Sequence, residues 1–166
     1  YEQWCEEVAH ALAARGHTMA VLTSHAGAAA ACQPVASSPV ASSPVASSPV
    51  AVYRLLHQQV EGGLAQTTLR LLRAPRRCEE ENLACTRSVI GQFQPDAVMI
   101  WGMWNIDRSV PQQIEALMGS RVAYYFCDYW PTLPSAYIQR FQEPARHAQA
   151  QQFKSLIGRY FLPRLV

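Results

Sequence analysis

Apolar positions recur at helical spacing near the start of the chain and then form a continuous run. Val8, Ala11 and Leu12 fall on one face of a helix. Gly16 stands where such a helix would end in a left-handed cap. Residues 18–24 follow as a short apolar run that is typical of a buried strand. A helix followed directly by such a strand is one step of an α/β unit.

The alternation of helical and strand-like patterns continues along the chain. Residues 97–101 and 122–126 are nearly continuous apolar runs, as expected of central parallel strands. This order predicts the α/β class, as a three-layer Rossmann-like fold with helices on both faces of one parallel sheet. In chain order, the predicted elements are a helix at 1–14, strands at 18–24 and 50–55, helices at 64–72 and 75–93, a strand at 97–101, a helix capped by Ser109 and ended by Gly119, a strand at 122–126, a short helix capped by Ser135, and a last helix with the apolar stripe Phe153, Leu156, Ile157, Tyr160 and Phe161.

Residues 34–51 interrupt this alternation with a low-complexity segment. The five-residue unit SSPVA occurs three times in succession over residues 37–51. Its recurring proline prevents a regular helix and blocks strand pairing. The segment is therefore predicted to be a solvated loop with partly polyproline II character. A surface loop without function is the first interpretation, and a flexible lid or linker is the second.

Composition narrows the class of protein. The 166 residues suffice for one domain with a sizeable core, and 49% hydrophobic residues indicate a globular chain. The net charge of +2 is too small to suggest a nucleic-acid partner. No signal peptide is visible, and no apolar run approaches the roughly 20 residues that span a bilayer. We therefore expect a cytoplasmic protein that binds no nucleic acid.

The cysteines suggest reduced thiols and no metal site. None of them forms a CxxC pair, and their odd number and scattered spacing are typical of a cytoplasmic protein. Two of them lie seven positions apart on a predicted helix, hence on one face, but no histidine or cysteine partner stands near them along the chain. The five cysteines are Cys5, Cys32, Cys78, Cys85 and Cys127.

Motifs of several enzyme classes are absent from the sequence. It contains no GxGxxG, Walker, GxSxG or HExxH motif, so the corresponding enzyme classes lose their main support. The five histidines are scattered, and His17, which follows Gly16, is expected to shape a turn.

Two predicted loops at the carboxyl ends of strands combine aromatic and polar side chains. They comprise residues 102–105 and 128–131. Ligands of open parallel sheets bind beyond these strand ends. A pyranose ring offers apolar faces for stacking and hydroxyls for hydrogen bonds, which suits such side chains. The predicted saccharide-binding residues are Trp104, Asn105, Asp128, Tyr129 and Trp130.

These residues also have structural interpretations. Trp130, like Trp101, is large and apolar enough to fill the core. A carboxylate at Asp128, at the end of an apolar strand, must be satisfied by solvent, a backbone amide or a ligand. Loop capping and ligand binding therefore both stay open for Asp128.

Three stretches of the chain carry motifs in a fixed order. They are Tyr1-Glu2-Gln3-Trp4-Cys5 through Arg15-Gly16-His17 to Val21-Leu22-Thr23-Ser24, then Gln94-Pro95-Asp96-Ala97-Val98, and finally residues 122–126 followed by Asp128-Tyr129-Trp130-Pro131. In this order they resemble the first domain of the family 4 glycosyltransferases. The resemblance covers the whole chain except the SSPVA segment.

The resemblance implies one half of a GT-B enzyme, in which two Rossmann-like domains face a cleft. It implies that the acceptor binds mainly the first domain and a nucleotide-sugar mainly the second. Transfer would retain the anomeric configuration and need no metal or other cofactor. On this expectation residues 1–166 are an incomplete N-terminal acceptor-side domain without the C-terminal donor-binding domain. The full-length protein would be the enzyme, and this fragment alone would be inactive.

The resemblance also assigns individual residues. Tyr1 and Glu2 would lie on the donor-phosphate side, because the family's Gly-rich loop would precede them. Asp128 is the candidate catalytic residue. Cys127 stands where the family often has a histidine, and a thiol does not replace an imidazole hydrogen bond. The implied partners are a nucleotide-sugar donor, a saccharide, lipid or small-molecule acceptor, and the C-terminal domain.

Two other functions are left open by the sequence. The first is a Rossmann-like module that binds sugar without catalysis, which Cys127 favours. The second is a different α/β enzyme, such as a nucleotide-sugar epimerase or reductase. That enzyme needs a Gly-rich dinucleotide loop between a strand and a helix, and the sequence contains none.

Basic residues accompany the apolar stripe of the last helix. The first interpretation is a helix that packs on its own sheet or on the C-terminal domain. The second is peripheral attachment to anionic lipid on the cytoplasmic face of a membrane. The basic residues are Arg140, Arg146, Lys154, Arg159 and Arg164.

Overall fold

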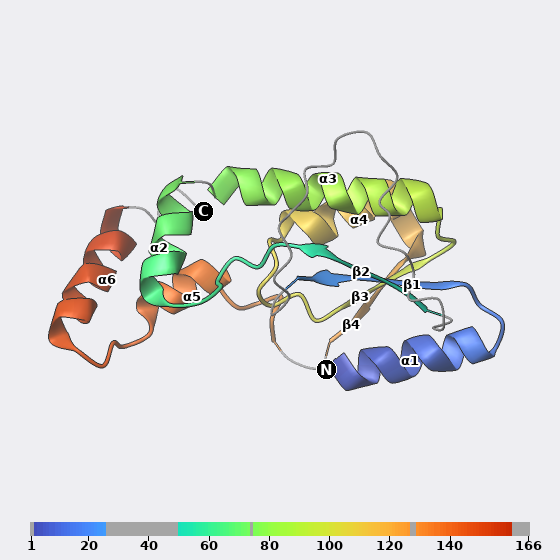
Figure 1. The fold of residues 1–166 in the computed structure, drawn as a ribbon, viewed down its shortest axis with the longest axis horizontal. Helices are drawn as coiled ribbons and strands as arrows, with labels where there is room; N and C mark the ends of the chain where they lie inside the picture. The colour runs from blue at the N-terminus through green and yellow to red at the C-terminus, as the bar shows by residue number, and fades with distance from the viewer. Residues whose placement is uncertain (1, 26–49, 74, 127–128, 161–166) are drawn as a thin grey trace.

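The computed structural model describes residues 2–25, 50–73, 75–126 and 129–160 (Figure 1). Helices and strands occur in the predicted order, and each boundary whose position the sequence predicts lies within one or two residues of it. The predicted loop at 34–51 lies outside the described residues, except for its last two positions, which open a strand. The elements are α1 (Glu2–Ala14), β1 (Met19–Ser24), β2 (Val50–Leu56), α2 (Leu64–Arg73), α3 (Pro75–Phe93), β3 (Val98–Trp101), α4 (Ser109–Met118), the 3₁₀ turn η1 (Gly119–Arg121), β4 (Val122–Tyr125), α5 (Ala136–Gln142) and α6 (Ala148–Tyr160).

The strands pair in parallel, as predicted, but as two separate pairs. β1 pairs with β2 from Met19 opposite Val50, and β3 pairs with β4 from Val98 opposite Val122. The described residues therefore form two two-stranded sheets instead of one continuous sheet. Helix α1 lies on one side of the strands, and α3 with α4 lies on the other (Figure 1). The arrangement is a mixed α/β fold with helices on both sides of its strands.

Strand β2 shows why the pattern of the sequence predicts strands well. Val52 and Arg54 are exposed, whereas Tyr53 and Leu55 are half-buried. Successive side chains of a strand point to opposite faces, so this alternation follows directly from the extended backbone. The predicted division of β2 into two faces is confirmed.

An apolar cluster joins β3 to α4, and we call it the β3–α4 core. Val110 is completely covered by its neighbours, and Ile100 is 3% exposed. Ile100 and Val110 belong to segments whose sequences are apolar, so the hydrophobic effect explains why β3 and α4 pack together. The buried members are Ile100, Val110, Ile114, Met118 and Trp130.

Two helix starts test the predicted caps. The Ser135 hydroxyl accepts from the Ile138 amide at 3.4 Å, which confirms Ser135 as the cap of α5. Ser109 was expected to cap α4, but it is the first residue of that helix. The Asp107 carboxylate accepts from the Ser109 amide at 3.0 Å instead. The first amides of a helix have no partner within the helix, so a nearby side-chain oxygen can accept from them. Both a serine hydroxyl and an aspartate carboxylate at the start of a helix can do this, and local spacing does not decide between them.

Helices α2, α5 and α6 form a second cluster beside the strands (Figure 1). Its buried members are Leu71, Tyr137, Phe141 and Ile157. Of the described part of the apolar stripe on α6, Ile157 alone is buried. The stripe was expected to pack on the sheet or on another domain. In the structure α6 folds back onto α5, and the exposed residues of the stripe are Phe153 (43%), Leu156 (55%) and Tyr160 (58%).

The buried face of α3 is more polar than its sequence suggests. Leu83, Ile90 and Phe93 were expected to point inward, but they are only half-buried. The fully buried side chains of this helix include Asn82 and Thr86. This face meets the end of β2, where backbone groups need hydrogen-bond partners that apolar side chains do not supply.

Candidate binding site at the ends of β3 and β4

The predicted binding residues after β3 have different environments. Trp104 is 48% exposed, and its indole N–H donates to the Gln139 side-chain oxygen at 3.3 Å. Asn105 is half-buried, and its side chain is engaged with the backbone of Val60. It accepts from the Val60 amide at 2.9 Å and donates to the Val60 carbonyl at 2.7 Å. Asn105 therefore holds the segment after β2 in place, whereas Trp104 faces solvent.

The predicted residues after β4 also divide into one core residue and one surface residue. Trp130 is 6% exposed and belongs to the β3–α4 core, which favours its structural interpretation. Tyr129 is 80% exposed. Its carbonyl accepts from the Thr132 amide and hydroxyl, both at 2.9 Å, so its backbone shapes the turn while its ring stays in solvent.

Some predicted site residues have no described position. Tyr1, Cys127 and Asp128 lie outside the described residues, so the catalytic and donor-side assignments stay predictions. Glu2 is the first residue of α1. Trp101, a candidate for the core, is half-buried and stacks on Tyr125 with ring centroids 4.1 Å apart.

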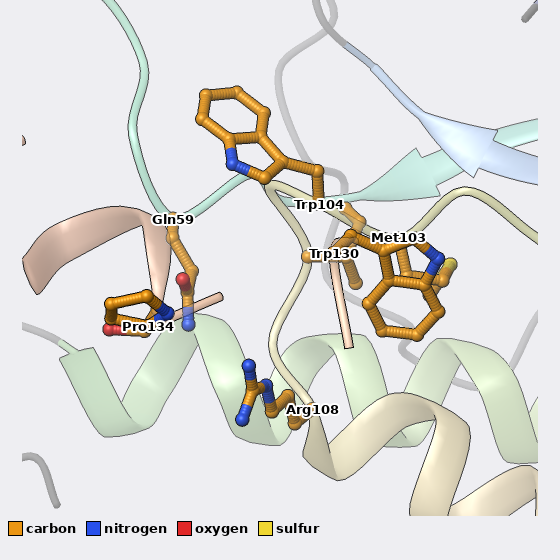
Figure 2. A pocket seen from close by; sticks show the side chains of 8 residues that line it. Gln59, Met103, Trp104, Arg108, Trp130 and Pro134 are labelled. Carbon is orange, nitrogen blue, oxygen red and sulfur yellow. The ribbon is translucent and has the colours of Figure 1, made fainter. Parts of the chain in front are cut away.

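A small enclosed space lies between the two predicted loops. It holds about 10 Å³, which is room for one water molecule and not for a sugar. In Figure 2 the side chains of Gln59, Arg108 and Pro134 converge on it, and the rings of Trp104 and Trp130 point in different directions. The lining residues are Gln59, Met103, Trp104, Ile106, Arg108, Trp130, Pro134 and Ser135.

Polar contacts fill the wall of this space. Gln59 donates to the Asp107 carboxylate at 3.0 Å and accepts from the Ala136 amide at 3.0 Å. The Arg108 guanidinium donates to the Leu133 carbonyl. These bonds tie together the loops after β2, β3 and β4. The residues around the small space therefore connect the loops to one another.

A larger hollow shares Trp130 and Arg108 with this small space, and we call it the open groove. Its volume is about 320 Å³, which reaches the lower limit of pockets that hold small molecules. It combines aromatic surface with both signs of charge. The lining residues are Arg108, Pro111, Gln112, Glu115, Tyr124, Phe126, Trp130 and Pro131.

Stacked rings form one wall of the open groove. Phe126 is 52% exposed and lies nearly parallel to Tyr124, with ring centroids 5.3 Å apart and planes 10° apart. Phe126 also meets Trp130 at a centroid distance of 5.8 Å. Phe126 directly follows β4, so it stands at the strand end where ligands of parallel sheets bind.

A tyrosine and a carboxylate form the polar wall. The Tyr124 hydroxyl donates to Glu115 Oε1 at 2.6 Å. Burial, the hydrogen bond to Glu115 and the charge of Glu115 together raise the pKa of Tyr124 to about 12. At neutral pH the phenol is therefore protonated and keeps the carboxylate in position.

Sequence reasoning missed most of the residues that line the open groove. A usable signal was present, because Tyr124 and Phe126 stand two positions apart and must share one face of a strand. Arg108 and Glu115 gave no such signal. Their place in the groove depends on how α4 packs against β4.

A second group of side chains lies outside the groove. Ligand atoms of His57, Cys78 and Glu81 lie within 4.8 Å of one another. The spacing of the cysteines along the chain gave no hint of this group, because its histidine follows β2 while the other two residues are on α3. These are the residues, among those described, that could hold a metal ion.

The basic residues near α6 are partly engaged within the fold. Lys154 is 5% exposed, and its ammonium donates to the Glu143 carbonyl at 2.6 Å. Arg140 pairs with the Glu143 carboxylate at 3.6 Å. Arg146 and Arg159 are exposed. Attachment to anionic lipid stays a prediction that these two exposed residues would carry, and Arg164 lies outside the described residues.

Comparison with known proteins adds no relative. No protein-family model, no curated protein and no solved structure matches the chain. Within the described residues, every helix is too short or too polar to cross a membrane. The resemblance to family 4 glycosyltransferases therefore rests on the sequence motifs alone.

Proposed function

We propose that the chain is the acceptor-binding domain of a retaining glycosyltransferase, a Rossmann-like half of a GT-B enzyme. The observation that carries the proposal is the open groove at the ends of β3 and β4. There the exposed ring of Phe126 lies beside Glu115 and Arg108. An apolar ring face next to charged hydrogen-bonding groups matches the alternating apolar and hydroxyl surfaces of a saccharide.

The groove suggests how an acceptor would be held. A pyranose would stack on Phe126, whose exposed half is free of core packing. The Glu115 carboxylate would accept hydrogen bonds from sugar hydroxyls, and the Arg108 guanidinium would donate to sugar oxygens. Tyr124 positions Glu115 through its 2.6 Å hydrogen bond. The donor and the bond-making step would belong to the second domain that the resemblance implies.

A sugar-binding module without catalysis is the second candidate. Cys127 favours it, because the family often has a histidine at that position and a thiol does not make the same hydrogen bond. Both candidates require saccharide binding in the open groove. They differ in whether a longer protein containing this chain transfers sugar from a nucleotide-sugar.

Saccharide binding is tested by saturation-transfer-difference NMR of the chain with a panel of mono- and disaccharides. We expect Phe126→Ala to weaken binding about 2–10-fold, since an aromatic contact contributes about 0.5–1.5 kcal/mol. Trp4→Ala is the matched control, because Trp4 is 54% exposed on α1, which does not line the groove. Equal effects of the two variants, or no binding by the parent chain, would contradict the proposal.

An assay of nucleotide-sugar turnover tests whether this chain can catalyse transfer without the second domain. We expect the chain alone neither to hydrolyse nor to transfer a panel of uridine, guanosine and adenosine diphosphate sugars. The residues that bind the donor would come from the second domain. Release of nucleoside diphosphate by the chain alone, measured by liquid chromatography, would show that the division into two domains is wrong.

A further inference from the structure

Three ligand-type side chains meet where β2 ends against α3. Cys78 and Glu81 are three positions apart on α3, so they lie on the same side of that helix. His57 directly follows β2, and its Nε2 lies 2.9 Å from Glu81 Oε2. One ligand atom from each of the three residues lies within 4.8 Å of the others.

The histidine of this group is held firmly. The His57 amide donates to Asn82 Oδ1 at 2.7 Å, and the Asn82 amide group donates to the His57 carbonyl at 3.0 Å. His57 is 8% exposed, and the ring of His25 packs edge-on against it at 4.6 Å. A Leu56 carbonyl 2.9 Å from His25 Nδ1 fixes the second ring in turn. The imidazole is therefore confined before any ligand arrives, which lowers the cost of binding one.

The carboxylate is oriented by a residue outside the group. Arg77 Nε donates to Glu81 Oε1 at 2.9 Å, while the other carboxylate oxygen points to His57. An outer hydrogen bond of this kind orients metal-ligating carboxylates in proteins. One oxygen of Glu81 is thus engaged with Arg77, and the other faces the centre of the group.

We propose that His57, Cys78 and Glu81 form a binding site for a divalent metal ion of the zinc class. Imidazole, thiolate and carboxylate are all zinc ligands, and thiolate disfavours magnesium and calcium. Zinc bonds of about 2.0–2.3 Å place tetrahedral ligand atoms about 3.3–3.8 Å apart. The widest separation, at most 4.8 Å, has to close by about 1 Å, while the 2.9 Å pair of His57 and Glu81 opens slightly. Rotation of the half-buried side chains of Cys78 and Glu81 would supply these small shifts.

Charge and protons balance in this site. A thiolate and a carboxylate neutralise the two positive charges of the ion. The imidazole binds in its neutral form through one ring nitrogen, and its single proton is on the other. The thiol proton of Cys78 leaves to solvent on binding, so affinity increases with pH. Three protein ligands leave a fourth tetrahedral position for water. The ion would join the end of β2 to α3, a role that is independent of saccharide binding in the open groove.

The test uses the whole 166-residue chain without a histidine tag, after treatment with a chelator. Zinc is titrated in competition with a chromophoric chelator, and Co²⁺ is titrated by absorption. We expect one equivalent of metal and a thiolate-to-cobalt charge-transfer band. Cys78→Ser should abolish that band, and His57→Gln and Glu81→Gln should each weaken binding at least about tenfold.

Each variant has a matched control elsewhere in the chain. The controls are Cys5→Ser at a half-buried position of α1, Glu80→Gln at an exposed position of α3, and His17→Gln in the turn after α1. Circular dichroism verifies that each variant is folded. Equal loss of metal in the site and control variants would show only adventitious binding and overturn the proposal.

X-ray absorption of the zinc-loaded parent chain gives a test that needs no variant. We expect a coordination shell with one sulfur and otherwise nitrogen or oxygen. A shell without sulfur, or with two or more sulfurs, would overturn the assignment. Failure of this site would leave the saccharide test untouched, because the groove and the metal group share no residue.

Discussion

Two contacts between helices and strands hold this fold together by different means. The β3–α4 core is apolar, and Val110 and Ile100 within it are almost completely buried. The contact between β2 and α3 buries polar groups instead, with Asn82 at 2% exposure and Thr86 at 0%. We call this second contact the β2–α3 seam. The two contacts bury these side chains to a similar depth, one with apolar residues and the other with polar residues.

The difference shows what each contact contributes. Apolar packing is non-directional, so the β3–α4 core sets where α4 lies and supports the open groove above it. Hydrogen bonds are directional, and both polar atoms of the Asn82 side chain are used on His57. The Thr86 hydroxyl adds a bond to the Asn82 carbonyl at 2.8 Å. The seam therefore fixes the position of single side chains, as a metal site requires.

The largest expected effect comes from emptying part of the apolar contact. Ile114→Ala should lower the free energy of unfolding by about 2–5 kcal/mol, because it leaves a cavity in the β3–α4 core. Leu117→Ala is the control on the same helix, since Leu117 is 45% exposed and should change stability by about 0.5 kcal/mol or less. Urea denaturation measures both. Similar losses in the two variants would show that the core does not lie where the structure places it.

A smaller effect is expected from the polar contact. Asn82→Ala should cost about 1–3 kcal/mol, because it leaves the buried amide and carbonyl of His57 without their partner. Asn82→Asp keeps the acceptor for the His57 amide but loses the donor. Hydrogen exchange of the His57 amide should therefore quicken strongly in Asn82→Ala and less in Asn82→Asp. Unchanged exchange in both would mean that the seam is not held by this pair.

The smallest effect concerns the polar wall of the groove. The pKa of Tyr124 is raised to about 12 in the folded state, against about 10 in an unfolded chain. The protonated phenol is therefore favoured by folding, and this contribution is complete below pH 10 and is lost between pH 10 and 12. The difference in melting temperature between the parent chain and Tyr124→Phe should shrink across that range. A difference that stays constant would indicate that Tyr124 is not buried against Glu115.

The sequence by itself determined the order and kind of the elements. Helical spacing at the start of α1 and the alternation along β2 depend on neighbours in the chain, so they are readable without the fold. The Ser135 cap was predicted for the same reason. The Ser109 cap was predicted in the same way and was wrong, since Asp107 accepts from the first amide of α4 instead.

Tertiary structure alone decided which side chains meet. Trp130, for which the sequence left sugar binding and core packing open, is buried in the β3–α4 core and also lines the open groove. Phe126 was not among the predicted binding residues, yet its exposed ring lines the same groove. His57 and Asn82 are 25 positions apart, yet they share two hydrogen bonds. Periodicity along a chain reports which face of an element is apolar. It carries no information on which other element will cover that face, because this depends on packing between distant segments.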